Sequence, residues 1–256
     1  MSMELWQFLV IFTVGVVAGV INTLAGGGSL ITLPVLIFLG LPATVANGTN
    51  RLAITVQSVL AVAGFKRKGV SNFKLSFLMS LPALIGAIIG AQLAVDVSDI
   101  LFKRILAVVM ILVLGLILWN PIRRGRGNVQ YNGGMTSLSK SRRIASMLIF
   151  FFIGVYGGFI QAGIGFLIIA VLTTMNGLNL VETNSHKVFI IGMNALFALI
   201  VFIFNSKICW PIGLALAAGN GLGGWIGSNL AVTKGERFIK LILAMCVAGM
   251  VVKLLI

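Results

Sequence analysis

Two basic residues stand inside apolar stretches of the chain. Arg51 lies in NGTNRLAI and Lys187 lies in TNSHKVFI. A cation near the centre of a membrane helix costs about 2.5 to 3.5 kcal/mol on insertion scales, so a compensating partner is expected. Short polar side chains suited to the oxygens of a small oxyanion surround both cations: Asn47, Thr49, Asn50, Thr183, Asn184, Ser185 and His186. These residues predict a site that binds a small anion.

Each of these residues also has an ordinary structural interpretation. Arg51 and Lys187 could lie near helix ends and extend to the lipid interface. The short polar residues could cap the N-termini of two helices. His186 is the only histidine and Glu182 is the one acid near it, which makes them the candidates for proton coupling, although a lone histidine is more often structural and Glu182 could be a first-turn carboxylate.

A glycine run interrupts the apolar stretch NTLAGGGSLITLP. Gly26, Gly27 and Gly28 loosen the helix there, and non-helical backbone at membrane depth is tolerated where it is buried in protein or faces a water-filled cavity. We predict that Ser29 caps the next helix and that Pro34 lies near its start. The amide groups and the positive dipole end of that helix would then attract an anion.

The second half of the chain carries a weaker copy of this break, QAGIGF. The glycines could serve only to pack helices closely, as small residues often do in membranes. Their repetition beside a helix too short to span favours a binding site. The predicted substrate site comprises Gly26, Gly27, Gly28, Ser29, Asn47, Thr49, Asn50, Arg51, Gln161, Gly163, Gly165, Ser185, His186 and Lys187.

The composition places these residues in a membrane protein. Of the 256 residues, 59% are hydrophobic and 9% are charged, which is more apolar side chain than one soluble core can enclose. Apolar stretches of about 20 residues recur, as transmembrane helices require, and the alternating segments of a β-barrel do not appear. The fold class is therefore predicted to be an all-α integral membrane protein. The first apolar segment, preceded by Glu4, is expected to be retained rather than cleaved.

The chain contains two similar units. Gly15-Val-Val-Ala-Gly19 resembles Gly154-Val-Tyr-Gly-Gly158, VANGTNRLAI resembles VETNSHKVFI, and GAIIGAQLA resembles GGWIGSNLA, in the same order and with nearly the same spacing. We predict a first membrane repeat at residues 1–120, a basic cytoplasmic linker at 121–143 and a second membrane repeat at 144–256.

Positive charge occupies opposite ends of the two units. FKRKGVSNFK is strongly basic whereas its counterpart FNSKICW holds one lysine, and the acidic turn VDVSD has the basic counterpart TKGERFIK. Because Lys and Arg mark cytoplasmic connections, the units are predicted to be inverted repeats, an arrangement typical of secondary transporters with a site near the membrane midplane. The net charge of +14 is thus a topology signal rather than evidence for nucleic acid.

Each unit is predicted to form a broken or re-entrant helix hairpin followed by three transmembrane helices. The predicted helices are 6–24, 29–40, 46–64, 73–94 and 101–119, then 144–160, 165–175, 181–204, 210–231 and 238–255. The second helix of each unit is too short to cross a bilayer alone.

The stretch AGVINTLAGGGSLITLPVLIFLGLPATVANGTNRLA and its weaker counterpart GVYGGFIQAGIGF resemble the two signatures of the TauE/SafE family of sulfite and organosulfonate exporters. The similarity covers nearly the whole chain. It implies export or exchange of sulfite, small organosulfonates or related carboxylates by a multi-pass protein of the inner (plasma) membrane. Thiosulfate-importing relatives depend on pathway cysteines, and Cys209 and Cys246 do not form such a pattern.

The leading hypothesis is a transporter that works by alternating access, with a small anion and the lipid bilayer as its partners. A passive anion channel or uniporter with the same cations is the alternative. An enzyme is not expected, because HExxH, GxSxG and paired intramembrane carboxylates do not occur. The two cysteines have no CxxC or histidine partner, so neither a metal site nor a cofactor is predicted, and a homodimer is left open.

Overall fold

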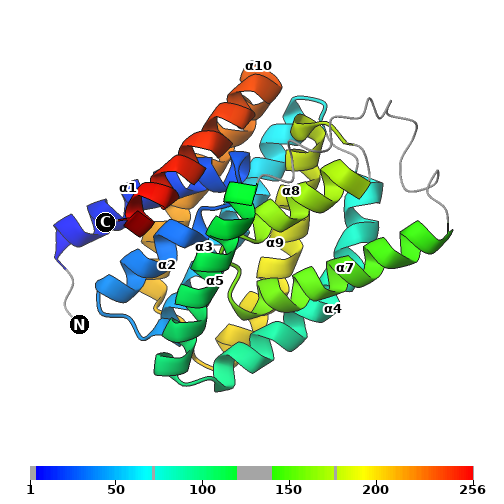
Figure 1. The fold of residues 1–256 in the computed structure, drawn as a ribbon. Coiled ribbons are helices and arrows are strands. Elements are labelled where there is room, and N and C mark those ends of the chain that lie inside the picture. Colours follow the sequence, from blue (N-terminus) through cyan, green and yellow to red (C-terminus); the bar gives the residue numbers. More distant parts are fainter. Residues whose placement is uncertain (1–3, 71–72, 120–139, 176–177, 256) are drawn as a thin grey trace.

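The computed structural model describes residues 4–70, 73–119, 140–175 and 178–255, and this part of the chain is helical without strands. The first half forms α1 (Leu5–Leu24), α2 (Ser29–Phe38), α3 (Ala43–Arg67), α4 (Phe73–Asp96) and α5 (Asp99–Trp119). The second half forms α7 (Lys140–Phe159), α8 (Ile164–Met175), α9 (Leu180–Phe204) and α10 (Trp210–Leu255), as Figure 1 shows. The predicted all-helical class is confirmed for these residues.

The helix boundaries follow the predicted ones closely, with two differences. The two helices predicted at 210–231 and 238–255 both lie within α10, where a non-helical kink at Gly235 (φ 68°, ψ −164°) takes the place of a longer connection. A glycine accepts this conformation without a steric penalty, so one helix ends and the next begins at this residue. The other difference is that α7 begins at Lys140, inside the predicted linker, and residues 121–139 of that linker lie outside the described residues.

Three helices in the described part of the chain are long and apolar enough to cross a membrane. They are α1, residues 74–96 of α4, and α9, while α2, residues 144–159 and α8 are apolar but shorter. At 10 residues, α2 extends about 15 Å, half of a hydrocarbon core. Large apolar side chains such as Leu5, Phe38 and Phe204 are more than three-quarters exposed, whereas Arg51 and Lys187 are fully buried. This distribution suits a lipid surrounding.

The long helices α3 and α9 pack against each other in an antiparallel arrangement (Figure 1). A Cβ added to Gly48, near the start of α3, would lie 2.1 Å from the carbonyl oxygen of Lys207, just beyond the end of α9. At the other end, the Ser185 hydroxyl near the start of α9 donates to the Val70 carbonyl at 2.6 Å, just beyond the end of α3. The start of each helix therefore lies at the end of the other.

Glycines bring the first helix of each half against a helix of the other half. A Cβ on Gly19 of α1 would lie 2.4 Å from the Asn220 carbonyl oxygen of α10, and one on Gly158 of α7 would lie 2.1 Å from the Ala87 carbonyl oxygen of α4. Such direct backbone contact is the usual function of small residues spaced four apart in membrane helices. Figure 1 shows α4 and α7 running side by side as a result.

Candidate functional site

The two predicted breaks meet, backbone to backbone. The first break lies between α1 and α2 and contains Gly26, whose φ is 88°. The second lies between α7 and α8, and Gly165 follows it in the first turn of α8. A Cβ added to Gly26 would lie 2.4 Å from the Cα of Gly165, and one added to Gly165 would lie 2.2 Å from the Cα of Gly26. No other residue type fits this contact, so the glycines allow the two breaks to touch.

The second break is built from a strained residue as well as glycine. Gln161 has a φ of 58°, a conformation rarely adopted by residues with a side chain, and Gly163 has a φ of 74°. The Gln161 side chain is buried, and its Oε1 accepts a hydrogen bond from Arg51. Strain of this kind persists where surrounding contacts enforce it, and it is concentrated at functional sites.

Arg51 of α3 binds the end of α7. Its Nη1 donates to the Gly157 carbonyl at 2.5 Å and to Gln161, and its Nη2 donates to the Gly158 carbonyl at 2.8 Å and to Asn47 Oδ1 at 3.3 Å. The guanidinium carbon lies 5.7 Å from the centre of the Phe202 ring of α9, within the range of a cation–π contact. Arg51 therefore satisfies carbonyl groups that the last turn of α7 leaves without intrahelical donors.

Lys187 of α9 binds the end of α1 in the corresponding way. Its Nζ donates to the Thr23 carbonyl at 2.7 Å and to Asn184 Oδ1 at 2.6 Å. The Asn184 amide in turn donates to the Leu24 carbonyl at 3.1 Å. Each cation thus stabilises the C-terminal end of the first helix of the opposite half. The interpretation that they extend to the lipid interface is wrong, because both side chains are 0% exposed.

The breaks carry a positive electrostatic balance. The oxygen partners of Arg51 and Lys187 among the described residues belong to carbonyl and amide groups, which carry partial charges only. Those at the ends of α1 and α7 correspond to the negative ends of helix dipoles, about half a charge each. Since α2 and α8 begin at the same breaks, the positive ends of their dipoles offset the negative ends of α1 and α7. The two full positive charges of Arg51 and Lys187 then remain. The arrangement is suited to bind an anion.

Ser29 does not cap α2 as predicted. Gly28 occupies the cap position with helical dihedral angles and no side-chain cap, and Ser29 is the first helical residue. Ser29 Oγ instead accepts from Asn50 Nδ2 at 3.3 Å, while Thr32 Oγ1 donates to Asn50 Oδ1 at 2.8 Å. Asn50 of α3 therefore fastens the start of α2 from the side. The packing explains the difference, because a Cβ on Gly28 would lie 2.4 Å from the Ala18 carbonyl oxygen.

The N-capping interpretation of the polar residues beside the cations is also wrong. α3 begins at Ala43 and α9 has Asn179 as its N-cap, so Asn47, Asn50 and Asn184 lie inside helices. Instead, two of them cap C-terminal ends. Asn184 binds the end of α1, and Asn47 Nδ2 donates to the Phe159 carbonyl of α7 at 2.8 Å.

Other predicted residues contact parts of the chain outside the breaks. Thr49 Oγ1 accepts from the Cys209 amide at 3.0 Å, and Ser185 donates to Val70, so both bind connections between long helices. His186 Nδ1 lies 2.7 Å from Ser76 Oγ on α4. Glu182 has one buried carboxylate oxygen without a hydrogen-bond partner in the described structure.

The sequence identified half of the groups that hold the two cations. Three of the six acceptors are side chains that it had singled out, Asn47, Gln161 and Asn184, and the other three are backbone carbonyls of α1 and α7, which carry no side-chain signal. Gln57 was also missed, and it links α3 to the last turn of α1. Its Oε1 accepts from Asn22 Nδ2 at 3.0 Å, and its Nε2 donates to Thr23 Oγ1 at 3.2 Å. A glutamine inside an apolar span was the signal available for it.

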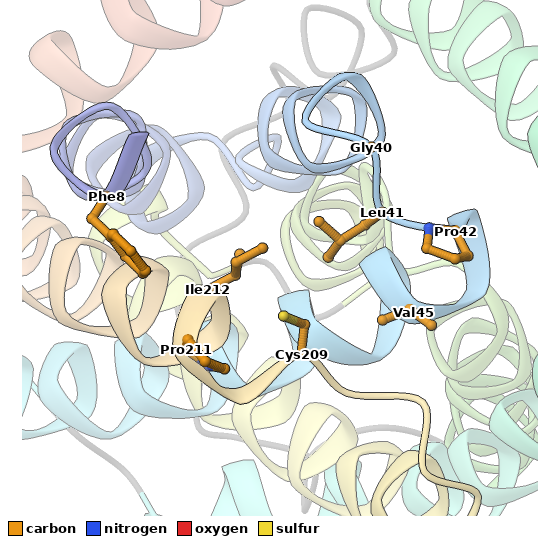
Figure 2. A pocket seen from close by; sticks show the side chains of 8 residues that line it. All are labelled: Phe8, Gly40, Leu41, Pro42, Val45, Cys209, Pro211 and Ile212. Carbon is orange, nitrogen blue, oxygen red and sulfur yellow. The ribbon is translucent and has the colours of Figure 1, made fainter. Parts of the chain in front are cut away.

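A cavity of about 380 Å³ lies elsewhere, where the α2–α3 connection meets the start of α10. Figure 2 shows apolar side chains such as Leu41, Val45 and Ile212 lining it, together with the Cys209 thiol. None of the predicted site residues lines this cavity. The two breaks are closely packed where Gly26 meets Gly165.

Comparisons with known proteins find relatives that are named as probable membrane transporters. A probable membrane transporter protein of Sinorhizobium sp is 29% identical over 255 residues, covering all of this chain and 94% of the relative. Another from Haemophilus influenzae is 29% identical over 232 residues, covering 90% of this chain and 88% of the relative. The probable membrane transporter protein YfcA of Escherichia coli K12 is 28% identical over 249 residues, covering 96% and 88%. No solved structure matches the chain.

The family comparison covers nearly the entire chain. Residues 11–254 match the family described as sulfite exporter TauE/SafE. The match includes both breaks, both buried cations and the glycines that pair α1 with α10 and α4 with α7. This chain therefore belongs to the sulfite exporter TauE/SafE family of membrane proteins.

Proposed function

We propose that this protein exports a small oxyanion across the inner membrane, with sulfite, small organosulfonates or related carboxylates as the substrate class. The family description and the relatives named as probable membrane transporters support transport. The observation that carries the proposal is the pair of fully buried cations, Arg51 and Lys187, held at two helix breaks that touch at Gly26 and Gly165.

A buried cation held only by dipoles favours an anion nearby. Taking an unpaired charge out of water costs several kcal/mol. Only a partner of opposite charge or several hydrogen bonds can offset a cost of this size. The carbonyl and amide oxygens around Arg51 and Lys187 supply part of this compensation. An oxyanion between the breaks would supply the rest of the compensation, and it would also be attracted by the positive dipole ends of α2 and α8.

The proposed mechanism is alternating access between two inverted repeats. Three matched features support it: α3 and α9 run antiparallel, each cation binds the first helix of the other half, and glycine pairs join α1 to α10 and α7 to α4. Every one of these contacts joins one half of the chain to the other. A rocking motion of the two halves would therefore open the breaks toward one side of the membrane and close them toward the opposite side.

A passive anion channel or uniporter is the second candidate. Export of an anion from a cell that is negative inside is already favourable, by about 2.3 kcal/mol per charge at 100 mV. His186, a candidate for proton coupling, contacts Ser76 rather than a break, which favours uncoupled movement. If His186→Gln and Glu182→Gln both retain the wild-type pH dependence of flux, neither residue couples protons.

Sulfite flux in proteoliposomes tests the proposal. Wild-type protein should give saturable flux, and Lys187→Met should lose most of it while remaining monodisperse in detergent. Lys68→Met is the matched control, because Lys68 is exposed at the end of α3 and should transport normally. Flux that never saturates would favour the channel, and full flux in Lys187→Met would remove the cationic site.

A further inference from the structure

Two buried polar side chains in the central helix pair have no hydrogen-bond partner in the described structure. Ser58 of α3 is 2% exposed and its Oγ is unpartnered; Asn194 of α9 is 1% exposed, and both its Nδ2 and its Oδ1 are unpartnered. An unsatisfied buried polar group costs about 1 to 3 kcal/mol. Such groups are rare in folded proteins, so these two call for an explanation.

Ser58 and Asn194 hold equivalent places relative to the two cations. Ser58 follows Arg51 by seven residues in α3, and Asn194 follows Lys187 by seven residues in α9. Seven residues make roughly two helical turns, so each polar residue lies on the same face of its helix as the cation. The repeat therefore presents one cation and one unpartnered polar group from each long helix.

The antiparallel register places both polar groups between the cations. Arg51 lies over Phe202, near the end of α9, and Ser185, close to Lys187, bonds to Val70 beyond the end of α3. Between these two contacts, a Cβ added to Gly192 of α9 would lie 2.7 Å from the Cβ of Ser58. Ser58 and Asn194 are thus at nearly the same height, midway along the pair.

Asn194 also adjoins the break that Arg51 binds. A Cβ added to Gly157 would lie 2.6 Å from Asn194 Nδ2, and the carbonyl of Gly157 accepts a hydrogen bond from Arg51. The absence of a side chain at Gly157 lets the Asn194 amide and the Ile164 side chain pack directly against this part of α7. Asn194 therefore lies beside the last turn of α7, which precedes the second break, with its donor and acceptor both free.

We propose that Ser58 and Asn194 form a midpoint binding site for the oxyanion as it passes between the Arg51 end and the Lys187 end. The hydroxyl and the amide NH₂ donate to oxyanion oxygens, and the amide oxygen accepts from a protonated oxygen or from a water that accompanies the anion. This inference rests on the proposed transport function and adds the residues that bind the substrate between the two cations.

Sulfite flux and thermal unfolding of Asn194→Leu and Ser58→Ala test the inference together. Each variant should lower the ratio of maximal flux to KM about tenfold, as expected for one lost hydrogen bond of about 1.4 kcal/mol to the moving anion. The unfolding temperature should be unchanged or higher, because an unsatisfied polar group has been removed. Ser80→Ala is the matched control, since its buried hydroxyl donates to the Phe77 carbonyl of its own helix at 2.8 Å.

The possible outcomes separate the inference from the function on which it rests. Active wild-type protein with wild-type flux in both variants would overturn the midpoint site and leave the transport function intact. Lower flux accompanied by a lower unfolding temperature would also overturn it, because the side chains would then be structural. Wild-type vesicles that carry no sulfite would overturn the proposed function and this inference with it.

Discussion

The two breaks, one held by Arg51 of α3 (the Arg51 end) and one by Lys187 of α9 (the Lys187 end), are stabilised in the same way with different chemistry. At one end Arg51 donates four hydrogen bonds to α7, to Gln161 and to Asn47. At the other end Lys187 donates two, to Thr23 and Asn184. The planar guanidinium reaches several acceptors at fixed angles, whereas an ammonium is a compact point charge on a flexible stem.

This difference indicates which end is held more firmly. The Arg51 end also includes the Gln161 side chain and a cation–π contact with Phe202, so side chains complete that break. The Lys187 end is completed largely by backbone carbonyls beside the glycine run. We therefore expect the Lys187 end to release first when the halves move, and the Arg51 end to serve as the more rigid support.

Replacing Arg51 should have the largest effect. Arg51→Leu leaves two backbone carbonyls and the oxygens of Gln161 and Asn47 without their donor, which should lower the free energy of unfolding by about 3 to 5 kcal/mol. Thermal unfolding in detergent measures this loss. Arg51→Lys keeps the charge and should recover part of the stability. A loss no greater than that of Lys187→Met would contradict the asymmetry.

The contact between the breaks should be nearly as sensitive. Gly26→Ala brings a Cβ against Gly165 and also places an alanine where the backbone has a positive φ. It should therefore lower the free energy of unfolding by about 2 to 4 kcal/mol. Gly165→Ala meets the same contact and should cost less. Gly69→Ala separates the two causes, because Gly69 has a φ of 74° but open space around it. Equal losses at Gly26 and Gly69 would show that the breaks do not touch.

Replacing Lys187 should cost less stability than replacing Arg51 and yet abolish transport. Lys187→Met removes two hydrogen bonds and should lower the free energy of unfolding by about 2 kcal/mol. Sulfite flux should fall at least a hundredfold, since the charge at the more mobile end is lost. Chemical denaturation and flux in the same preparation provide both values. A variant that unfolds earlier but transports normally would make Lys187 purely structural.

The smallest effects are expected where the long helices bind the connections. Thr49→Val and Ser185→Ala each remove one hydrogen bond and should destabilise by about 1 kcal/mol. In a Cys246→Ser background, Thr49→Val should also speed labelling of Cys209 by a water-soluble maleimide, because the Cys209 amide loses its acceptor. An unchanged labelling rate would show that this contact does not limit the access of the reagent to Cys209.

The sequence predicted the elements and the cations better than their partners. Glycine runs and changes of hydropathy marked the helix ends, and the repeat singled out Arg51 and Lys187 as an equivalent pair. Three of their six acceptors are the backbone carbonyls of Thr23, Gly157 and Gly158, which any residue would present, so the pattern contained no information about these three.

The error at the start of α2 has a physical cause that local sequence does not contain. Ser29 is a favourable cap residue, but Gly28 packs too closely on Ala18 for any side chain. The amide of Asn50, 21 residues away in the sequence, donates a hydrogen bond to the Ser29 hydroxyl. TKGERFIK was predicted to connect two helices, and the kink at Gly235 separates them within that segment. Tertiary packing decided the first case, whereas the second follows from the conformational freedom of glycine.

Equilibrium binding of labelled sulfite to the purified protein in detergent tests the central claim most directly. Wild-type protein and Lys68→Met should bind sulfite saturably with the same affinity, while Arg51→Lys should bind weakly and Lys187→Met should show no saturable binding. Wild-type affinity in Lys187→Met would contradict the claim that the buried cations at the two breaks bind the anion.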